Sequence, residues 1–359
     1  MAGRPLGAKA AAVRETIAEM CESPPDALEL VEEVAERVRR VVPFDGGAWW
    51  VSDPESMLPT NVTKVEDNLG APDLHVAFVR AELLEGDGDV NSFFEMARKG
   101  ETAAGLALTT GGDMTSSKRY RDIHLPYGIH DELRVIARSA GEAWAMGCVS
   151  RGDDLPEFTE DEVRWVASIA SHLGQGVRTA LSRMPQVPIE LRTPGMLVLA
   201  DDGTVEAATG EAERWLGTLD SPHPGMLPAP INSVAIQAQA NAGRETARPA
   251  RVRVQMRGGG WLLVHADVLR HAGDAAAKVA VVLEPADRAE LLPLLLALHG
   301  LTDREREVAE LLVSGLSTDE VAARLVISRH TVRDHVKSIF AKVGVGSRPE
   351  LTAALGLAA

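Results

Sequence analysis

The C-terminal part of the chain carries a repeated signal for the start of a helix. The runs Thr302-Asp-Arg-Glu305, Ser317-Thr-Asp-Glu320 and Ser347-Arg-Pro-Glu350 each place Glu three residues after Ser or Thr. At this spacing the hydroxyl accepts a hydrogen bond from one free backbone N–H group, and the carboxylate accepts from another. Ser328 is a fourth good N-cap. The pattern predicts four short helices, over 303–313, 318–325, 329–343 and 348–356.

The third predicted helix has two chemically different sides. At about 100° per residue, four apolar side chains fall on one stripe, which predicts a core-facing side. These are Val332, Val336, Ile339 and Val343. The opposite side carries His330, Arg333, Asp334, Lys337 and Ala341. Long cationic side chains suit the major groove of DNA, where Arg and Lys reach guanine acceptors or phosphates. Thr331, Ser338 and Lys342 lie on one flank, where they are expected to hold phosphates.

The second and third helices are joined only by Val326-Ile327-Ser328. Two helices joined by so short a turn form a helix-turn-helix. An unrelated helical hairpin in a bundle has the same spacing, so the spacing alone leaves both interpretations open.

A helix, a sheet and a closing helix are predicted over residues 24–183. Apolar residues recur at helical spacing after Asp26, and strands are predicted over 47–51, 133–137 and 144–149. Another capping box, Thr159-Glu-Asp-Glu162, opens a long amphipathic helix.

Residues 195–285 predict a hairpin, a helix and three antiparallel strands. Asp201-Asp202 follows an apolar strand, as the acidic pair of a phosphorylated receiver domain does. It continues as Asp-Asp-Gly-Thr, which is a hairpin turn signal, and no second Asp ends a strand about 45 residues later. We therefore reject a receiver domain. Arg251 and Arg253 alternate with valines, which predicts a half-buried strand with a solvated side.

Composition fits a folded chain of several domains. The 359 residues are 45% apolar and 25% charged, with a net charge of −15. Residues 299–359 hold eight cations and eight anions, so the whole excess of negative charge precedes them. Within 328–348 there are five cations and one anion, which is a candidate nucleic-acid footprint or, alternatively, a solvated helix face.

The C-terminal residues resemble those of a known family, the LuxR-type DNA-binding domain. The resemblance rests on Gly300-Leu-Thr-Asp-Arg-Glu-Arg-Glu-Val308, on Gly315 to Leu325 and on Ile327 to Val345. It implies that Arg333, Asp334 and Lys337 face the bases and that Thr331 approaches the backbone. It also implies a dimer contact at Leu351 and Leu355. The expected DNA-binding residues are Arg329, His330, Thr331, Arg333, Asp334, Lys337 and Lys342.

The preceding regions resemble two sensor folds more weakly. Residues 24–183 resemble a GAF domain, and 195–285 resemble a PAS-like fold. No convincing match to an acyl-homoserine-lactone sensor is present. Trp49, Trp50 and Trp144 are expected in the core, with a sensor pocket as the alternative.

Other chemistry is not predicted. No nucleophile is paired with a base, and no histidine spacing indicates a metal site, so no catalytic residue, metal or cofactor is expected. Two cysteines, Cys21 and Cys148, cannot form a disulfide framework or a four-cysteine zinc site. Neither a signal peptide nor a membrane span is predicted, so the chain is expected in the cytoplasm.

The expected fold class is multidomain α+β: a GAF-like α/β sensor, a PAS-like α+β domain and an all-α, four-helix, LuxR-type helix-turn-helix. The expected parts are a flexible tail 1–23, the GAF-like domain 24–183, a linker 184–194, the PAS-like domain 195–285, a connecting helix 286–298 and the DNA-binding domain 299–359.

The expected function is that of a bacterial transcription regulator, not an enzyme, which binds double-stranded DNA as a homodimer. Contact with RNA polymerase and an unidentified small-molecule ligand stay open. The alternative is a protein-interaction scaffold with a DNA-binding tail and no ligand.

Overall fold

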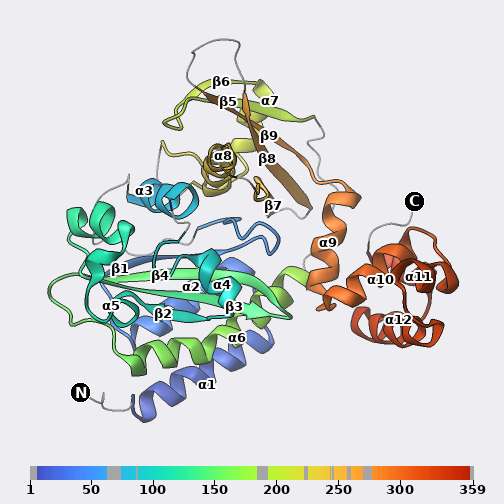
Figure 1. Cartoon of the computed structure of the whole chain (residues 1–359), viewed down its shortest axis with the longest axis horizontal. Coiled ribbons are helices and arrows are strands. Elements are labelled where there is room, and N and C mark those ends of the chain that lie inside the picture. Colours follow the sequence, from blue (N-terminus) through green and yellow to red (C-terminus); the bar gives the residue numbers. More distant parts are fainter. Residues whose placement is uncertain are drawn as a thin grey trace. The chain divides into compact units, whose positions relative to one another are not determined.

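The chain forms two compact units, a first made of most of residues 1–285 and a second made chiefly of residues 286–359 (Figure 1). The computed structural model describes residues 6–62, 74–85, 88–183, 193–221, 225–242, 244, 246–256, 260–269 and 277–355. Most of the linker expected over 184–194 lies outside the described residues. Two antiparallel sheets with helices in the first unit and helices in the second make the chain a multidomain α+β protein.

The first sheet has four antiparallel strands in the order β1-β4-β3-β2. They are β1 (Gly46–Val51), β2 (Ala103–Gly105), β3 (Asp131–Ser139) and β4 (Glu142–Arg151). The helices around it are α1 (Ala8–Glu22), α2 (Ala27–Arg39), α3 (Leu74–Arg80), α4 (Phe93–Lys99), α5 (Leu106–Thr110) and α6 (Glu160–Arg183), with the short turns η1 (Ala81–Glu85), η2 (Met114–Ser116), η3 (Tyr120–His124) and η4 (Leu125–Tyr127). Three of the strands were predicted from sequence, whereas the three-residue β2 was not.

The long helix α6 packs directly against β3. A Cβ atom at Gly174 would lie 2.5 Å from the backbone of Arg138, so only glycine permits this approach. Gly176 has the same effect toward α1, where a Cβ would lie 2.9 Å from the Cβ of Cys21. Figure 1 shows α6 and α1 lying together on one side of the sheet.

The N-terminal segment expected as a flexible tail over 1–23 is largely helical, and that expectation was wrong. Helix α1 packs on α6, where the indole N–H of Trp165 donates to the carbonyl of Ala10 at 3.0 Å. Ile17 and Cys21 are buried. The sequence signal was weak because only three residues of α1 are buried, namely Ala10, Ile17 and Cys21.

The second sheet has five antiparallel strands in the order β6-β5-β9-β8-β7. They are β5 (Gly195–Leu199), β6 (Val205–Ala208), β7 (Arg251–Gln255), β8 (Trp261–Leu269) and β9 (Lys278–Pro285), accompanied by α7 (Gly210–Leu216) and α8 (Ala229–Asn241). Asp202 accepts from the N–H of Thr204 at 2.9 Å in the β5–β6 turn, as the hairpin prediction requires. The acidic pair is therefore part of a turn.

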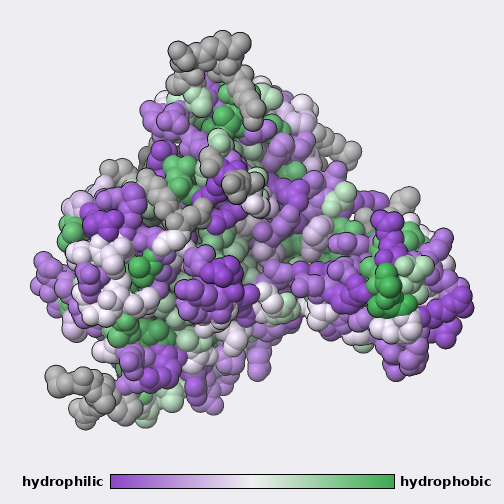
Figure 2. All heavy atoms as spheres, viewed as in Figure 1, coloured by the Kyte–Doolittle hydropathy of each residue, from purple (hydrophilic) through white to green (hydrophobic). Residues whose placement is uncertain are grey.

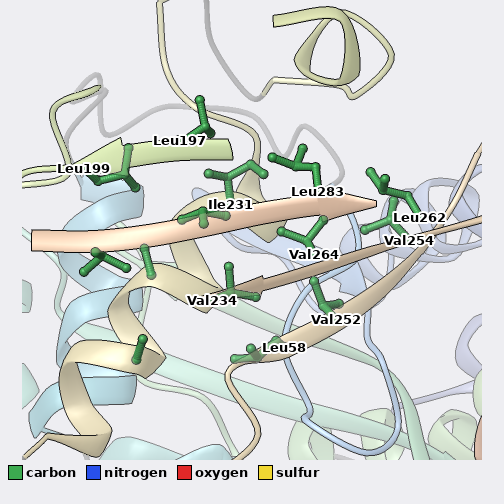
Figure 3. Close-up of a cluster of buried hydrophobic side chains, with 14 of the residues drawn as sticks. Leu58, Leu197, Leu199, Ile231, Val234, Val252, Val254, Leu262, Val264 and Leu283 are labelled. Atoms are coloured by element: carbon green, nitrogen blue, oxygen red, sulfur yellow. The ribbon is translucent and has the colours of Figure 1, made fainter. Parts of the chain in front are cut away.

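The N-terminal region of the first unit contributes apolar residues to the core of the second sheet. Leu58, which follows β1, packs among Val252, Val254 and the other apolar residues of the second sheet (Figure 3). Leu83 of η1 enters the same core. The regions expected as separate domains are thus joined by buried apolar contacts.

A buried ion pair reinforces this joint. Arg253 lies on the edge strand β7, where its backbone N–H and guanidinium group donate to Asp53 at 2.6–2.9 Å. Both side chains are at most 4% exposed. The expectation that Arg253 lies on a solvated side was wrong. Asp53, in a loop 200 residues away in the sequence, accepts hydrogen bonds from the backbone and the side chain of Arg253 at the edge of the sheet.

The second unit contains five helices in its described residues. They are α9 (Arg288–Leu298), α10 (Asp303–Val313), α11 (Thr318–Leu325), α12 (Arg329–Val343) and α13 (Arg348–Ala354). The predicted bounds of α10, α11 and α12 are confirmed. Both reciprocal hydrogen bonds of a capping box are present at Thr302 and at Ser317. At Ser347 the Glu350 carboxylate accepts instead from the N–H of Gly346.

We predict that Asp53→Ala destabilises the first unit by about 3–5 kcal/mol, because it leaves a buried guanidinium without its partner. All six tryptophans lie in this unit, so tryptophan fluorescence during urea unfolding of the full chain reports on it. Glu211→Ala, which removes an exposed pair with Arg214, serves as the control and should cost less than about 1 kcal/mol. Equal losses for the two variants would contradict the prediction.

Candidate nucleic-acid interface

Helix α12 begins and ends at defined caps. The hydroxyl of Ser328 accepts from the N–H of Thr331 at 3.0 Å, and Gly344 ends the helix in the left-handed conformation. Glycine adopts this conformation without the steric penalty that a Cβ brings. The helix is therefore held at the length that the sequence predicts.

The two sides predicted for α12 are present in the structure. Val332 and Ile339 are fully buried in the core of the second unit, and Val336 and Val343 pack beside them. On the opposite side, exposed side chains form what we call the reading side. They are His330, Arg333, Asp334, Lys337 and Ala341. The unit thus presents cationic and polar groups outward from a helix whose other side is anchored.

Two side-chain pairs lie on or next to the reading side. Arg329 is paired with Asp319 of α11 at 2.6 Å, a partner that sequence reasoning missed. His330 lies 3.6 Å from Asp334, one helical turn later. Both pairs are exposed to solvent and so contribute little to stability. The Arg329 guanidinium group stays accessible to an external anion such as a phosphate.

Lys342 and Ser338, which were expected to hold phosphates, have a structural role within the unit. The Lys342 ammonium donates to Glu305 Oε2 at 2.7 Å and to the carbonyl of Gly300 at 3.2 Å. Ser338 donates to Glu305 Oε1 at 2.6 Å. The same carboxylate accepts from the backbone N–H of Thr302 at 2.7 Å, so it joins the start of α10 to the middle of α12.

These contacts lower the pKa of Glu305. Burial by itself raises the pKa of this carboxyl group, but the hydrogen bonds from Lys342, Ser338 and Thr302 outweigh burial and lower it to about 2. The glutamate is consequently ionised throughout the physiological pH range, and its charge compensates that of Lys342.

Leu351 and Leu355 do not form an external surface. They are 0% and 1% exposed and belong to the core of the second unit. Helix α13 contacts both α10 and α12, which covers its apolar side within one chain. The expectation that these leucines make the dimer contact was therefore wrong, and a homodimer would use other residues.

Comparison with known proteins identifies this helical unit. Residues 299–355 match the model for bacterial regulatory proteins of the luxR family. A 51-residue segment is 53% identical to a putative HTH-type transcriptional regulator from Aeromonas salmonicida, covering 14% of this chain and 26% of that protein. A 50-residue segment is 50% identical to the spore germination protein GerE of Bacillus subtilis, covering 14% of this chain and 68% of GerE. The chain belongs to the LuxR family.

Residues 299–355 therefore form a LuxR-type helix-turn-helix domain, as the sequence predicts, and the chain spans about a quarter of the length of the Aeromonas salmonicida relative. The matched residues are α10 to α13, so the family assignment rests on the second unit. Among solved structures, Escherichia coli SdiA is 12% identical over 97% of this chain and 98% of that chain, with a TM-score of 0.34. The GAF domain of a Coxiella burnetii phosphotransferase is 13% identical over 49% of this chain and 96% of that chain, with a TM-score of 0.32. TM-scores this low do not establish a shared fold.

The first unit contains a crevice of about 240 Å³ that sequence reasoning missed. One wall is the α3–η1 segment, with Ala77, Arg80 and Ala81, and the facing wall includes Lys118 and Arg119. No sequence motif indicated it, because its walls come from segments about 40 residues apart that bear no regular spacing.

A buried ion network lies behind this crevice. Glu132 is fully buried and accepts from Arg119 at 2.8 Å and from Arg134 at 3.0 Å. Arg134 also pairs with Glu82 of η1 at 2.6 Å. Burial raises the pKa of Glu132, but the two guanidinium groups outweigh it and hold the pKa well below its usual range. The network ties the crevice wall to the first sheet.

Two kinds of feature are absent from the described residues. Within the described residues, no group of three or more His, Cys, Asp or Glu side chains is placed to hold a metal ion. None of the described helices combines the length and apolar character needed to span a bilayer.

The low pKa of Glu305 predicts a pH-dependent stability of the second unit. Because the folded-state pKa lies below the usual value of 4.5, the ionised carboxylate stabilises the fold above about pH 4.5, and this stability is lost as the pH falls toward 2. At about 1.4 kcal/mol per pKa unit, the loss is about 3 kcal/mol.

Urea unfolding of residues 286–359, followed by circular dichroism between pH 6 and pH 2, measures this loss. Glu305→Gln should be less stable at pH 6 and should lack most of the decline, whereas exposed Glu310→Gln should follow the wild type. Parallel curves for wild type and Glu305→Gln would show that the carboxylate has no such role.

Proposed function

We propose that the chain regulates transcription by placing the reading side of α12 in the major groove of an operator, as a homodimer. The observation that carries this proposal is the exposed group of Arg333, Asp334 and Lys337 on a helix whose other side is anchored in the core. Arg and Lys on such a helix reach guanine acceptors, and Asp accepts from a cytosine amino group. Arg329 and Thr331, at the start of the helix, position it on the phosphate backbone.

Two kinds of variant distinguish a base contact from a phosphate contact. Arg333→Ala should weaken binding to a selected operator by about 1–3 kcal/mol and relax specificity at one base pair. Lys337→Ala should also weaken this binding, whereas Arg329→Ala, which removes a phosphate contact, should weaken all sequences alike and reduce the salt dependence. Fluorescence anisotropy with selected and scrambled duplexes at two salt concentrations measures both effects.

Lys342→Ala serves as the matched control. Because its ammonium group is engaged with Glu305, its removal should lower the melting temperature of the second unit and leave the affinity of the folded protein for DNA nearly unchanged. Arg333→Ala with unaltered affinity and specificity would contradict the proposed reading side.

We further propose that the first unit is the sensor and that its crevice takes a small polar molecule. The α3–η1 segment supports this role because it lines the crevice through Arg80 and Ala81, supplies Glu82 to the ion network and inserts Leu83 into the core of the second sheet. A molecule bound in the crevice would therefore touch a segment that contacts residues of both sheets.

Filling the crevice tests the sensor proposal. Native mass spectrometry of full chain purified from its host should show a bound small mass in the wild type, absent in Ala81→Phe because the added ring occupies the crevice. Leu108→Phe, at an exposed position outside the crevice, should retain it. A wild-type chain that carries no small mass but retains a protein partner would favour the interaction scaffold.

A further inference from the structure

The turn between α11 and α12 contains a residue whose backbone and side chain are both unusual. Val326 has φ 54° and ψ 47°, in the left-handed region, where it ends α11. The other described residues from 286 onward with positive φ are glycines, at 300, 315 and 344. A β-branched side chain is disfavoured in this conformation because its Cβ crowds the following carbonyl oxygen. Val326 thus adopts a backbone conformation that Gly300, Gly315 and Gly344 adopt in the other turns of this part of the chain.

The side chain of Val326 does not pack in the core of the unit. It is 89% exposed, and it is the one large, exposed hydrophobic side chain among the described residues of the second unit. Its neighbour Ile327 packs against the core, so the turn needs only one apolar residue to anchor it. The space-filling view shows apolar residues gathered on the second unit among hydrophilic ones (Figure 2).

The position of Val326 indicates what it contacts. It lies two residues before Ser328, the N-cap of the reading helix, and it is followed by Arg329 and His330, which are exposed. Arg324, on the preceding helix, is exposed as well. The cationic side chains of Arg324 and Arg329 favour DNA over an apolar protein surface as the partner of this turn. The apolar group that the major groove offers is the methyl group of thymine.

We propose that Val326 contacts the methyl group of a thymine at the edge of the operator half-site. Strained residues that persist at a surface mark functional contacts more often than chance, because the surrounding structure must hold them there. The proposal rests on the DNA-binding role of α12. It makes Val326 a specificity-determining residue next to the reading side, acting through apolar contact rather than hydrogen bonding.

Deoxyuridine scanning tests the contact, since uracil differs from thymine only by the missing methyl group. A duplex selected from a random pool by the full chain is made with each thymine replaced in turn. The wild type should lose roughly three- to fivefold in affinity at one position per half-site, the loss of about one buried methyl group. Val326→Asn should bind the unmodified duplex more weakly by the same factor and should show no further loss at that position.

Stability provides an independent readout. Asparagine tolerates the left-handed region, so Val326→Asn should keep or raise the melting temperature of the second unit while it weakens DNA binding. Val326→Gly should bind like Val326→Asn, whereas Lys337→Ala should keep the full deoxyuridine penalty.

Three outcomes would overturn the proposal. The first is an unchanged affinity of Val326→Asn, and the second is a deoxyuridine penalty that persists in this variant. The third is normal DNA binding with lost transcription in vitro, which would assign Val326 to a protein contact. If the wild type selects no sequence, the proposed function fails together with this inference, whereas sequence selection that depends on Arg333 but not on Val326 removes this inference alone.

Discussion

A single carboxylate holds the reading helix in place. Glu305 belongs to the capping box that starts α10, yet it also accepts hydrogen bonds from Ser338 and Lys342 of α12. Because it is buried, its charge must be matched within the unit, and the ammonium group of Lys342 does so. One local helix signal thereby becomes a tertiary constraint. The angle at which α12 presents Arg333 and Lys337 depends on it, together with the apolar contacts of Val332 and Ile339.

In the first unit as well, buried side chains join segments that lie far apart in the sequence. Its two sheets are joined by apolar side chains such as Leu58 and Leu83 and by the pair of Asp53 with Arg253. A buried pair contributes geometric definition more than net stability, because desolvation offsets much of the attraction between its charges. The α3–η1 segment lies where the crevice, the ion network and the joint core meet.

Much of the second unit could be predicted because its signals are local. The hydroxyl and carboxylate of a capping box lie three residues apart, and an apolar stripe repeats every 3.6 residues, so α10, α11 and α12 were predicted with their bounds. The contacts that Lys342 and Leu351 make within the unit were not predicted, for a complementary reason. An exposed position on an isolated helix is solvent-facing by angle, but whether another helix covers it depends on packing.

The sequence by itself determined the helix-turn-helix, the reading side of α12, the LuxR-type resemblance and the α+β class, since each depends on short-range spacing and residue type. Only the tertiary structure decided that α1 is an ordered helix, that Arg253 is buried against Asp53, and that Leu351 and Leu355 fill a core. It also revealed the crevice and the strained, exposed Val326. Each of these depends on segments far apart in the chain, or on a backbone angle that valine rarely adopts. No local pattern of apolar and polar residues encodes such features.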